Sequence, residues 1–164
     1  MPNNDSSNLV KNGFTASTKM AGNLQRVLVD LADLHLQGKQ AHWNVVGHNF
    51  RDLHLQLDEV VDMAREAGDT IAERMRALHV IPDGRADTIA ATSSLPAFPS
   101  GEQDTETVVN LMTGCLHKAA ATMRDVHDAV DHEDPSTSDL LHEIIDQTEK
   151  QAWMLSAENR KPAH

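Results

Sequence analysis

The segment from His42 to Asp58, HWNVVGHNFRDLHLQLD, concentrates side chains that can bind a metal ion. It holds three of the ten histidines of the chain together with two aspartates. His54 and Asp58 are four residues apart, so on a helix they lie on one face and can direct an imidazole and a carboxylate at one point. This mixture of nitrogen and oxygen ligands suits iron, manganese or zinc.

A second pair with the same spacing, Asp69 and Glu73, follows on the same expected helix. The 15 residues from 54 to 69 span roughly 22 Å of helix, so the two pairs cannot meet within one straight helix. Their spacing is symmetric, because 54 with 73 and 58 with 69 share the midpoint 63.5. Two copies packed antiparallel about a two-fold axis near Met63 and Ala64 would unite the pairs into two identical sites.

Other interpretations of these residues remain open. A polar stripe along a helix is also typical of a solvated face with internal charge pairs. His42, at the end of the preceding helix, could complete the half-site with His54 and Asp58, or it could be a structural residue before Trp43. No glutamate is followed three residues later by a histidine, so the Glu-x-x-His pairs usual in ferritin-type di-iron bundles are not supported.

Apolar residues at three- and four-residue steps predict the four long helices that would position these side chains. The first runs from about Ser17 towards Trp43, and the second from an N-cap at Asn49, with Asp52 in its first turn, to about Leu78. The third runs from Asp104 to the acidic break at 131–134. The fourth begins at Asp134-Pro135, as N-cap and first helical residue, and carries its last apolar residue at Leu155.

Residues 83–104 contain Pro96, Pro99 and Gly101, which predicts a long crossover with one short helix around Asp87 to Ala91. No segment shows the alternation of a β-strand. We therefore expect an all-α fold, a ferritin-like four-helix bundle with a long crossover carrying a short helix between helices 2 and 3. The expected units are a flexible N-terminal tail (1–16), the bundle (17–160) and a short C-terminal tail (161–164).

Composition restricts the partners. The chain has 25 acidic and 14 basic side chains and a formal charge of −11, which opposes non-specific binding to nucleic acid. The sequence contains no apolar segment long enough to predict a membrane span. Cys115 is the only cysteine, and its apolar neighbours indicate a buried small hydrophobe, which fits a reducing compartment. We expect a soluble, cytoplasmic protein without a membrane partner.

Two segments resemble the Dps family, the DNA-binding proteins from starved cells or mini-ferritins. They are His42-Trp43-Asn44-x-x-Gly47-x-x-Phe50-x-x-x-His54-x-x-x-Asp58 and Asp69-Thr70-Ile71-Ala72-Glu73-Arg74. The resemblance implies a homododecamer, hollow and tetrahedral, with a ferroxidase centre at each two-fold interface. By similarity, His42, His54 and Asp58 of one subunit and Asp69 and Glu73 of its mate bind the iron, and Trp43 lies beside the site as a catalytic residue.

The activity implied is oxidation of Fe(II) to Fe(III), with hydrogen peroxide generally favoured over dioxygen, and storage of ferric mineral that protects against oxidative damage. Two alternatives are a nucleoid-compacting DNA-binding protein with secondary iron chemistry and a shell adapted to another reaction, such as amide hydrolysis. Family members that bind DNA usually do so through lysine-rich tails. The tails here offer only Lys11, Lys19, Arg160 and Lys161, so DNA is a possible partner that the sequence does not favour.

The remaining acidic residues and histidines have two interpretations each. Glu59, Asp62 and Glu66 are candidates for mineral nucleation or for a solvated surface. Asp131, Glu133, Asp134 and Asp139 are candidates for an acidic pore ring or for helix-end capping. The other histidines, including His48, His79, His117, His127 and His142, have no partner spacing that distinguishes them from surface or core residues.

Overall fold

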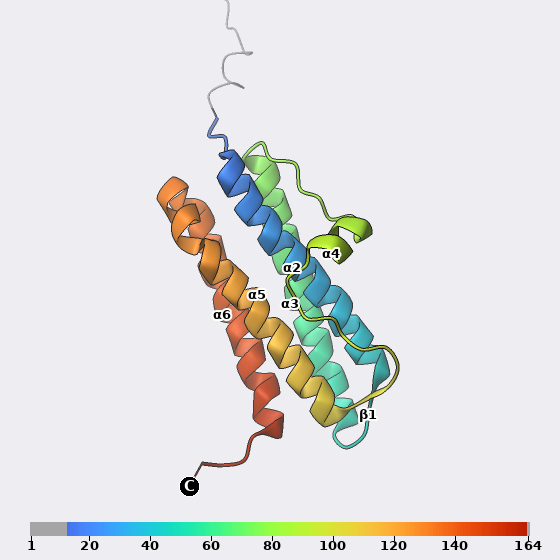
Figure 1. The fold of residues 1–164 in the computed structure, drawn as a ribbon. Helices are drawn as coiled ribbons and strands as arrows, with labels where there is room; N and C mark the ends of the chain where they lie inside the picture. The colour runs from blue at the N-terminus through green and yellow to red at the C-terminus, as the bar shows by residue number, and fades with distance from the viewer. Residues whose placement is uncertain (1–12, 164) are drawn as a thin grey trace, which may run out of the picture.

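Four long helices and one short helix make up the part of the chain that the computed structural model describes, residues 13–163. Helix α2 (Thr18–Asn44) packs mainly against α3 (Phe50–Ala77), and α5 (Thr105–Glu133) packs mainly against α6 (Pro135–Asn159). The short helix α4 (Ala86–Thr92) lies in the crossover that joins the two pairs (Figure 1). This is the all-α, ferritin-like bundle that the sequence predicts.

The buried faces of the helices match the predicted periodicity. The apolar residues that recur at three- and four-residue steps along α3 are buried, namely Leu53, Leu57, Val60, Val61, Ala64, Gly68, Ile71 and Met75. The core continues as two stacked clusters, one around Leu34, Leu57 and Met112 and the other around Leu24, Ile71 and Met123. Continuous burial along all four helices holds the ends of α2 and α3 in fixed positions.

The helix boundaries and the N-cap positions Asn49 and Asp134 agree with the predictions, but neither of these side chains makes a capping hydrogen bond. Ser17 Oγ accepts the Met20 backbone N–H at 3.1 Å and caps α2. Asn49 precedes α3 as predicted, yet its side chain does not cap the helix. Its backbone is left-handed (φ 58°) rather than extended, and the side-chain amide donates to Glu158 instead. Asn49 is therefore the N-cap residue of α3 as predicted, but its side chain does not supply the capping hydrogen bond.

Asp134 also occupies the N-cap position of α6 without a capping hydrogen bond to the backbone of that helix. Its carboxylate accepts hydrogen bonds from Arg74 Nη2 at 2.7 Å and from Thr137 Oγ1 at 2.5 Å. The carboxylate thus links α3 to the start of α6 across 60 residues of sequence.

A pair of two-residue strands lies within the predicted all-α fold, contrary to the expectation of no β-structure. Strand β1 (Val45–Val46) follows α2, and β2 (Gln103–Asp104) ends the crossover; they pair in parallel, with Val45 opposite Gln103. Two residues are too few to produce a detectable alternation in the sequence. The pairing attaches the end of the crossover to the α2–α3 turn.

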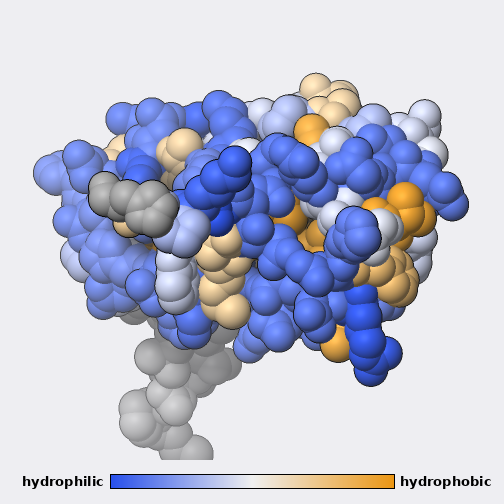
Figure 2. All heavy atoms as spheres, turned by 90° about the horizontal axis from the view of Figure 1, so that it is seen from below, coloured by the Kyte–Doolittle hydropathy of each residue, from blue (hydrophilic) through white to orange (hydrophobic). Residues whose placement is uncertain are grey.

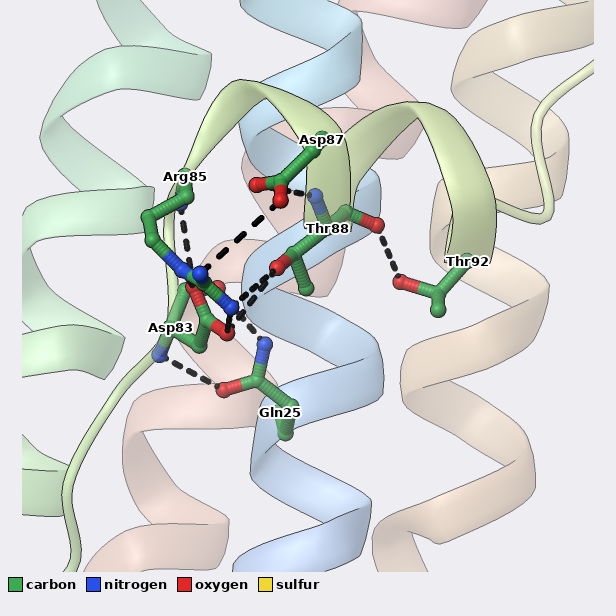
Figure 3. A network of polar contacts seen from close by, with 6 residues as sticks. All are labelled: Gln25, Asp83, Arg85, Asp87, Thr88 and Thr92. Atoms are coloured by element: carbon green, nitrogen blue, oxygen red, sulfur yellow. Dashed lines mark hydrogen bonds and ion pairs between the residues drawn. The ribbon is translucent and has the colours of Figure 1, made fainter.

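The start of the crossover is held by a polar network (Figure 3). Gln25 of α2 exchanges two hydrogen bonds with the backbone of Asp83, at 2.7 and 3.0 Å. The Asp83 carboxylate accepts from Arg85 Nη2 at 2.8 Å and from Thr88 Oγ1 at 2.9 Å. Farther along, the buried carboxylate of Asp30 accepts from Ser94. The crossover is therefore attached to α2 at several points.

The single cysteine is buried beneath the crossover, as predicted. Cys115 Sγ lies 3.4 Å from Gln37 Oε1 and 3.8 Å from the carbonyl oxygen of Pro96. Burial raises the pKa of the thiol to about 12, so it stays protonated at neutral pH and is a poor nucleophile. Among the described helices, none combines the length and the apolarity needed to cross a membrane.

Candidate metal centre

Two histidines meet where α2 ends and α3 begins. His42 Nδ1 lies 2.8 Å from the backbone carbonyl oxygen of His54, and His54 Nδ1 lies 2.9 Å from that of His42. The rings stack with centroids 3.6 Å apart and planes 19° apart. A carbonyl only accepts, so each Nδ1 carries the hydrogen and each Nε2 keeps a lone pair for a metal ion. The reciprocal bonds therefore fix both tautomers.

Asp58 adds a carboxylate to these two imidazoles, since its Oδ1 lies 3.3 Å from His42 Nδ1. The same oxygen accepts a hydrogen bond of 2.6 Å from Lys39 Nζ. This hydrogen bond is the main reason why the pKa of Asp58 is lowered, with smaller contributions from the nearby histidines. The carboxylate is thus ionised at neutral pH, with an ammonium group beside the position of an incoming cation.

Lys39 is a site residue that the sequence analysis did not identify. It precedes His42 by three residues on α2, so the two lie on neighbouring parts of one face. That spacing is visible in the sequence, but a protonated lysine is not a metal ligand, so ligand chemistry alone does not indicate it.

The aromatic residues around this half-site lie at the surface. The ring of Phe50 is 5.1 Å from that of His54, and Trp43 is 69% exposed. Seen from the end of the bundle where α2 passes into α3, the surface is mostly hydrophilic, with apolar side chains gathered on one side (Figure 2). Exposed large apolar side chains often mark an association surface.

Asp69 and Glu73 do not join this cluster within one chain. Both are exposed on α3, which is continuous, so roughly 22 Å of helix separates His54 from Asp69. Among residues 13–163, no group of three or more potential ligands is positioned to hold a metal ion. The five predicted ligands thus form two separate groups.

A groove of about 730 Å³ runs along α2 and α3 at the predicted symmetry centre. Small and charged side chains line it, among them Ala64, Gly68, Arg65 and Asp69. Asp69, one of the two predicted ligands outside the histidine cluster, thus lies on a surface that a second helix could cover.

The acidic residues near the start of α6 make contacts within the chain. Glu133 accepts 2.6 Å hydrogen bonds from the backbone N–H and the hydroxyl of Ser17. The bond from the hydroxyl is the main reason why the pKa of the Glu133 carboxyl is lowered. Asp131 accepts from the Ser138 hydroxyl at 2.6 Å. These contacts support local helix-end roles. Glu59, Asp62 and Glu66 are exposed.

A second histidine pair, His127 and His142, was missed because the two residues lie on different helices and 15 positions apart. Their rings stack with centroids 4.5 Å apart. Helical periodicity within one segment gives no information about such a pair.

Comparison with known proteins identifies the family of this chain. The ferritin-like domain family matches residues 21–162. The chain is 35% identical to the structure of Dps92 from Deinococcus radiodurans, with a TM-score of 0.82 and coverage of 85% of this chain and 84% of that one. The chain belongs to the Dps family of ferritin-like proteins. The Dps structure from Microbacterium arborescens in its high iron form is 32% identical, with a TM-score of 0.84 and coverage of 91% and 100%.

Two curated proteins are also similar to this chain. The DNA protection during starvation protein 2 of Deinococcus radiodurans is 34% identical over 157 residues, which are 96% of this chain and 65% of that protein. This chain therefore spans slightly less than two thirds of that relative. The fine tangled pili major subunit of Haemophilus ducreyi is 35% identical over 147 residues, covering 88% of this chain and 78% of that protein.

Proposed function

We propose that this Dps-family protein oxidises Fe(II) to Fe(III) at a two-iron site shared between two copies of the chain, and stores the ferric product in a hollow assembly. The reciprocal hydrogen bonds between His42 and His54 support this proposal most directly. They leave the lone pairs of both Nε2 atoms available, and the ionised Asp58 lies in the same cluster, 3.3 Å from His42 Nδ1. This donor set fits iron, for which imidazole and carboxylate are suitable ligands.

The proposed half-sites meet when two α3 helices pack antiparallel. His54 of one copy then approaches Glu73 of the other, and Asp58 approaches Asp69. The groove lined by Ala64 and Gly68 supports this packing because small side chains allow close helices. An isologous contact of this kind generates two identical sites.

In the proposed reaction, two Fe(II) ions bind as substrates, and binding displaces Lys39 from Asp58. Each iron gives up one electron, and the two electrons cleave the O–O bond of hydrogen peroxide; two protons complete two water molecules. The carboxylates favour Fe(III) over Fe(II) because they add negative charge around the ion. Trp43, exposed and next to His42 in the chain, is proposed to quench a stray oxidising equivalent.

The assembly and its setting are also part of the proposal. We propose a dodecamer whose cavity holds ferric mineral, acting in the cytoplasm against oxidative damage. DNA compaction is the competing function, and the net charge of −11 disfavours it. A gel shift that persists near physiological salt would favour compaction instead.

A subunit-mixing experiment tests the shared site. His54→Ala damages one half-site and Glu73→Ala the other, so each variant alone should oxidise Fe(II) poorly. In mixed oligomers, an interface between the two variants contains one intact and one doubly damaged site. With random mixing, half of the interfaces are of this kind, so about a quarter of the sites are intact. We expect about a quarter of the wild-type peroxide-dependent rate after anaerobic Fe(II) loading.

A mixture of His54→Ala with Asp58→Ala provides the control, because both substitutions damage the same half and no mixed interface is intact. Native mass spectrometry should verify mixing in both samples. Equal, near-zero rates in the two verified mixtures would overturn the shared-site proposal.

A further inference from the structure

The α5–α6 pair carries two histidines whose ring nitrogens face each other. His127 of α5 and His142 of α6 stack with centroids 4.5 Å apart and planes 26° apart, and their Nε2 atoms are 2.6 Å apart. The side chains are 23% and 58% exposed, respectively. The pair is therefore positioned by the helices and reachable from solvent.

A nearby carboxylate determines which ring nitrogen of His127 carries hydrogen. His127 Nδ1 lies 3.1 Å from Asp128 Oδ1, and His142 Nδ1 lies 3.7 Å from Asp139 Oδ1. An ionised carboxylate only accepts hydrogen bonds, so His127 Nδ1 carries the hydrogen and His127 Nε2 keeps a lone pair, whereas 3.7 Å is too long for a hydrogen bond from His142. Without a metal ion, His142 Nε2–H can therefore donate to His127 Nε2 across the 2.6 Å contact. A metal ion can take the place of this hydrogen when the His142 ring carries its hydrogen on Nδ1 instead.

The surroundings favour a metal cation. A pocket of about 380 Å³ adjoins the pair and is lined by Arg124, Asp146 and Glu149, among others. Arg124 is held by Glu149 through two hydrogen bonds, at 2.7 and 3.0 Å. Asp146 has no such cationic partner among the described residues, and it follows His142 by four residues, on the same face of α6.

We propose that His127 and His142 bind a divalent transition-metal ion of the zinc and copper class through Nε2, with water completing the coordination and Asp146 adding negative charge in the adjoining pocket. Two nitrogens at zinc-bond length in a tetrahedron lie about 3.3 Å apart. The observed 2.6 Å separation thus has to open slightly, which rotation of the more exposed His142 permits. Asp128 orients the His127 ring, as carboxylates commonly do for histidine ligands.

This site is separate from the proposed iron site, because it lies on the other helix pair and uses none of its residues. It can therefore exist whether or not the chain oxidises iron.

The test measures Zn²⁺ binding to the full chain by calorimetry in a His54→Ala background, which removes a ligand of the proposed iron site. We expect His127→Ala and His142→Gln each to weaken one class of Zn²⁺ site at least tenfold. Asp146→Asn should weaken it less. His132→Ala, which alters an exposed histidine on the same helix, is the control and should match the background.

Circular dichroism and size-exclusion chromatography check that each variant folds and assembles. If His127→Ala disturbs the fold, His142→Gln at the more exposed position decides the outcome. Zinc-soaked crystals should show an anomalous difference peak between the two Nε2 atoms. Unchanged Zn²⁺ stoichiometry and affinity in the folded variants, or absence of that peak, would overturn the proposal and leave the contact as a hydrogen bond between the two rings.

Discussion

The two halves of the proposed iron site differ in how much of their geometry one chain provides. His42 and His54 are fixed by reciprocal hydrogen bonds, and Asp58 is held by Lys39. Asp69 and Glu73 are exposed, and no hydrogen bond or ion pair holds either carboxylate among the described residues. One half is therefore organised by the fold, whereas the other is left for a second molecule to organise.

This difference indicates that folding of one chain positions the histidines and Asp58, whereas assembly of two chains positions the exposed carboxylates. Imidazole ligands need the correct tautomer and orientation, which neighbouring backbone carbonyls supply as soon as α2 and α3 pack. Exposed carboxylates need only be brought near the metal. Coupling the complete site to assembly would restrict rapid oxidation to oligomers that can also store the product.

The largest effect should come from removing ligands of the organised half. We expect His42→Ala and Asp58→Ala each to lower the rate of Fe(II) oxidation by more than about 100-fold, since even outer residues of metal sites cost 10- to 100-fold. Stopped-flow absorbance of ferric products measures the rate. Asp87→Ala, an exposed change on α4, is the control. Rates within a few-fold of wild type in the ligand variants would remove these residues from the site.

Removing a ligand of the other half should leave one metal position. In Glu73→Ala, we expect anaerobic calorimetry to detect Fe(II) bound by His42, His54 and Asp58, because a single chain holds these residues in place. Oxidation should fall by about tenfold or more, because the second iron is weakly held. Complete loss of Fe(II) binding in this variant would contradict the proposed independence of the organised half.

Two buried glycines differ in the space that surrounds them within the chain. A Cβ at Gly38 would lie 2.8 Å from Val61 Cγ2, whereas the nearest atom to one at Gly68 is Leu31 Cβ at 3.9 Å. Gly38→Ala should therefore destabilise the fold by about 1–2 kcal/mol despite its better helix propensity. Gly68→Ala should be neutral or stabilising, measured by urea unfolding at one fixed protein concentration.

A larger side chain at an exposed position of the groove tests the two-fold contact. Arg65 lines the groove and is exposed, so Arg65→Trp should impair association of the chains, as measured by light scattering, while helical content is retained. Normal assembly of that variant would exclude the groove around Arg65 as the two-fold contact.

The smallest effect should come from Lys39→Met, which removes the ammonium group that an incoming cation must displace. We expect the organised half to bind Fe(II) up to about fivefold more tightly, since a partly exposed ion pair is worth at most about 1 kcal/mol. Anaerobic calorimetry in the Glu73→Ala background measures this half alone. Weaker binding in Lys39→Met would indicate that the lysine positions Asp58 rather than competing with the metal.

The sequence predicted the helices well because each has an uninterrupted apolar face that the fold buries. It predicted the meeting of His42, His54 and Asp58 because only a short turn separates α2 from α3. The same reasoning did not predict the β1–β2 contact between Val45 and Gln103, since two-residue strands leave no periodic pattern.

Contacts between helices distant in sequence were the least predictable. Periodicity shows which face of a helix is buried, but it does not give the rotation and height of one helix relative to another. The pairing of His127 with His142 depends on both quantities. The missing side-chain cap at Asn49 has a different cause. The backbone of this residue is left-handed, and helical periodicity gives no information about the backbone conformation of a turn.

The thiol of Cys115 can be used to measure internal motion of the protein without an added label. The chain has one thiol, which is 1% exposed and lies under the crossover against Gln37 and Pro96. A thiol-specific reagent can modify it only when this part of the bundle opens, so the modification rate gives the free energy of that opening. Breathing of the crossover can thus be followed in the intact, unlabelled protein.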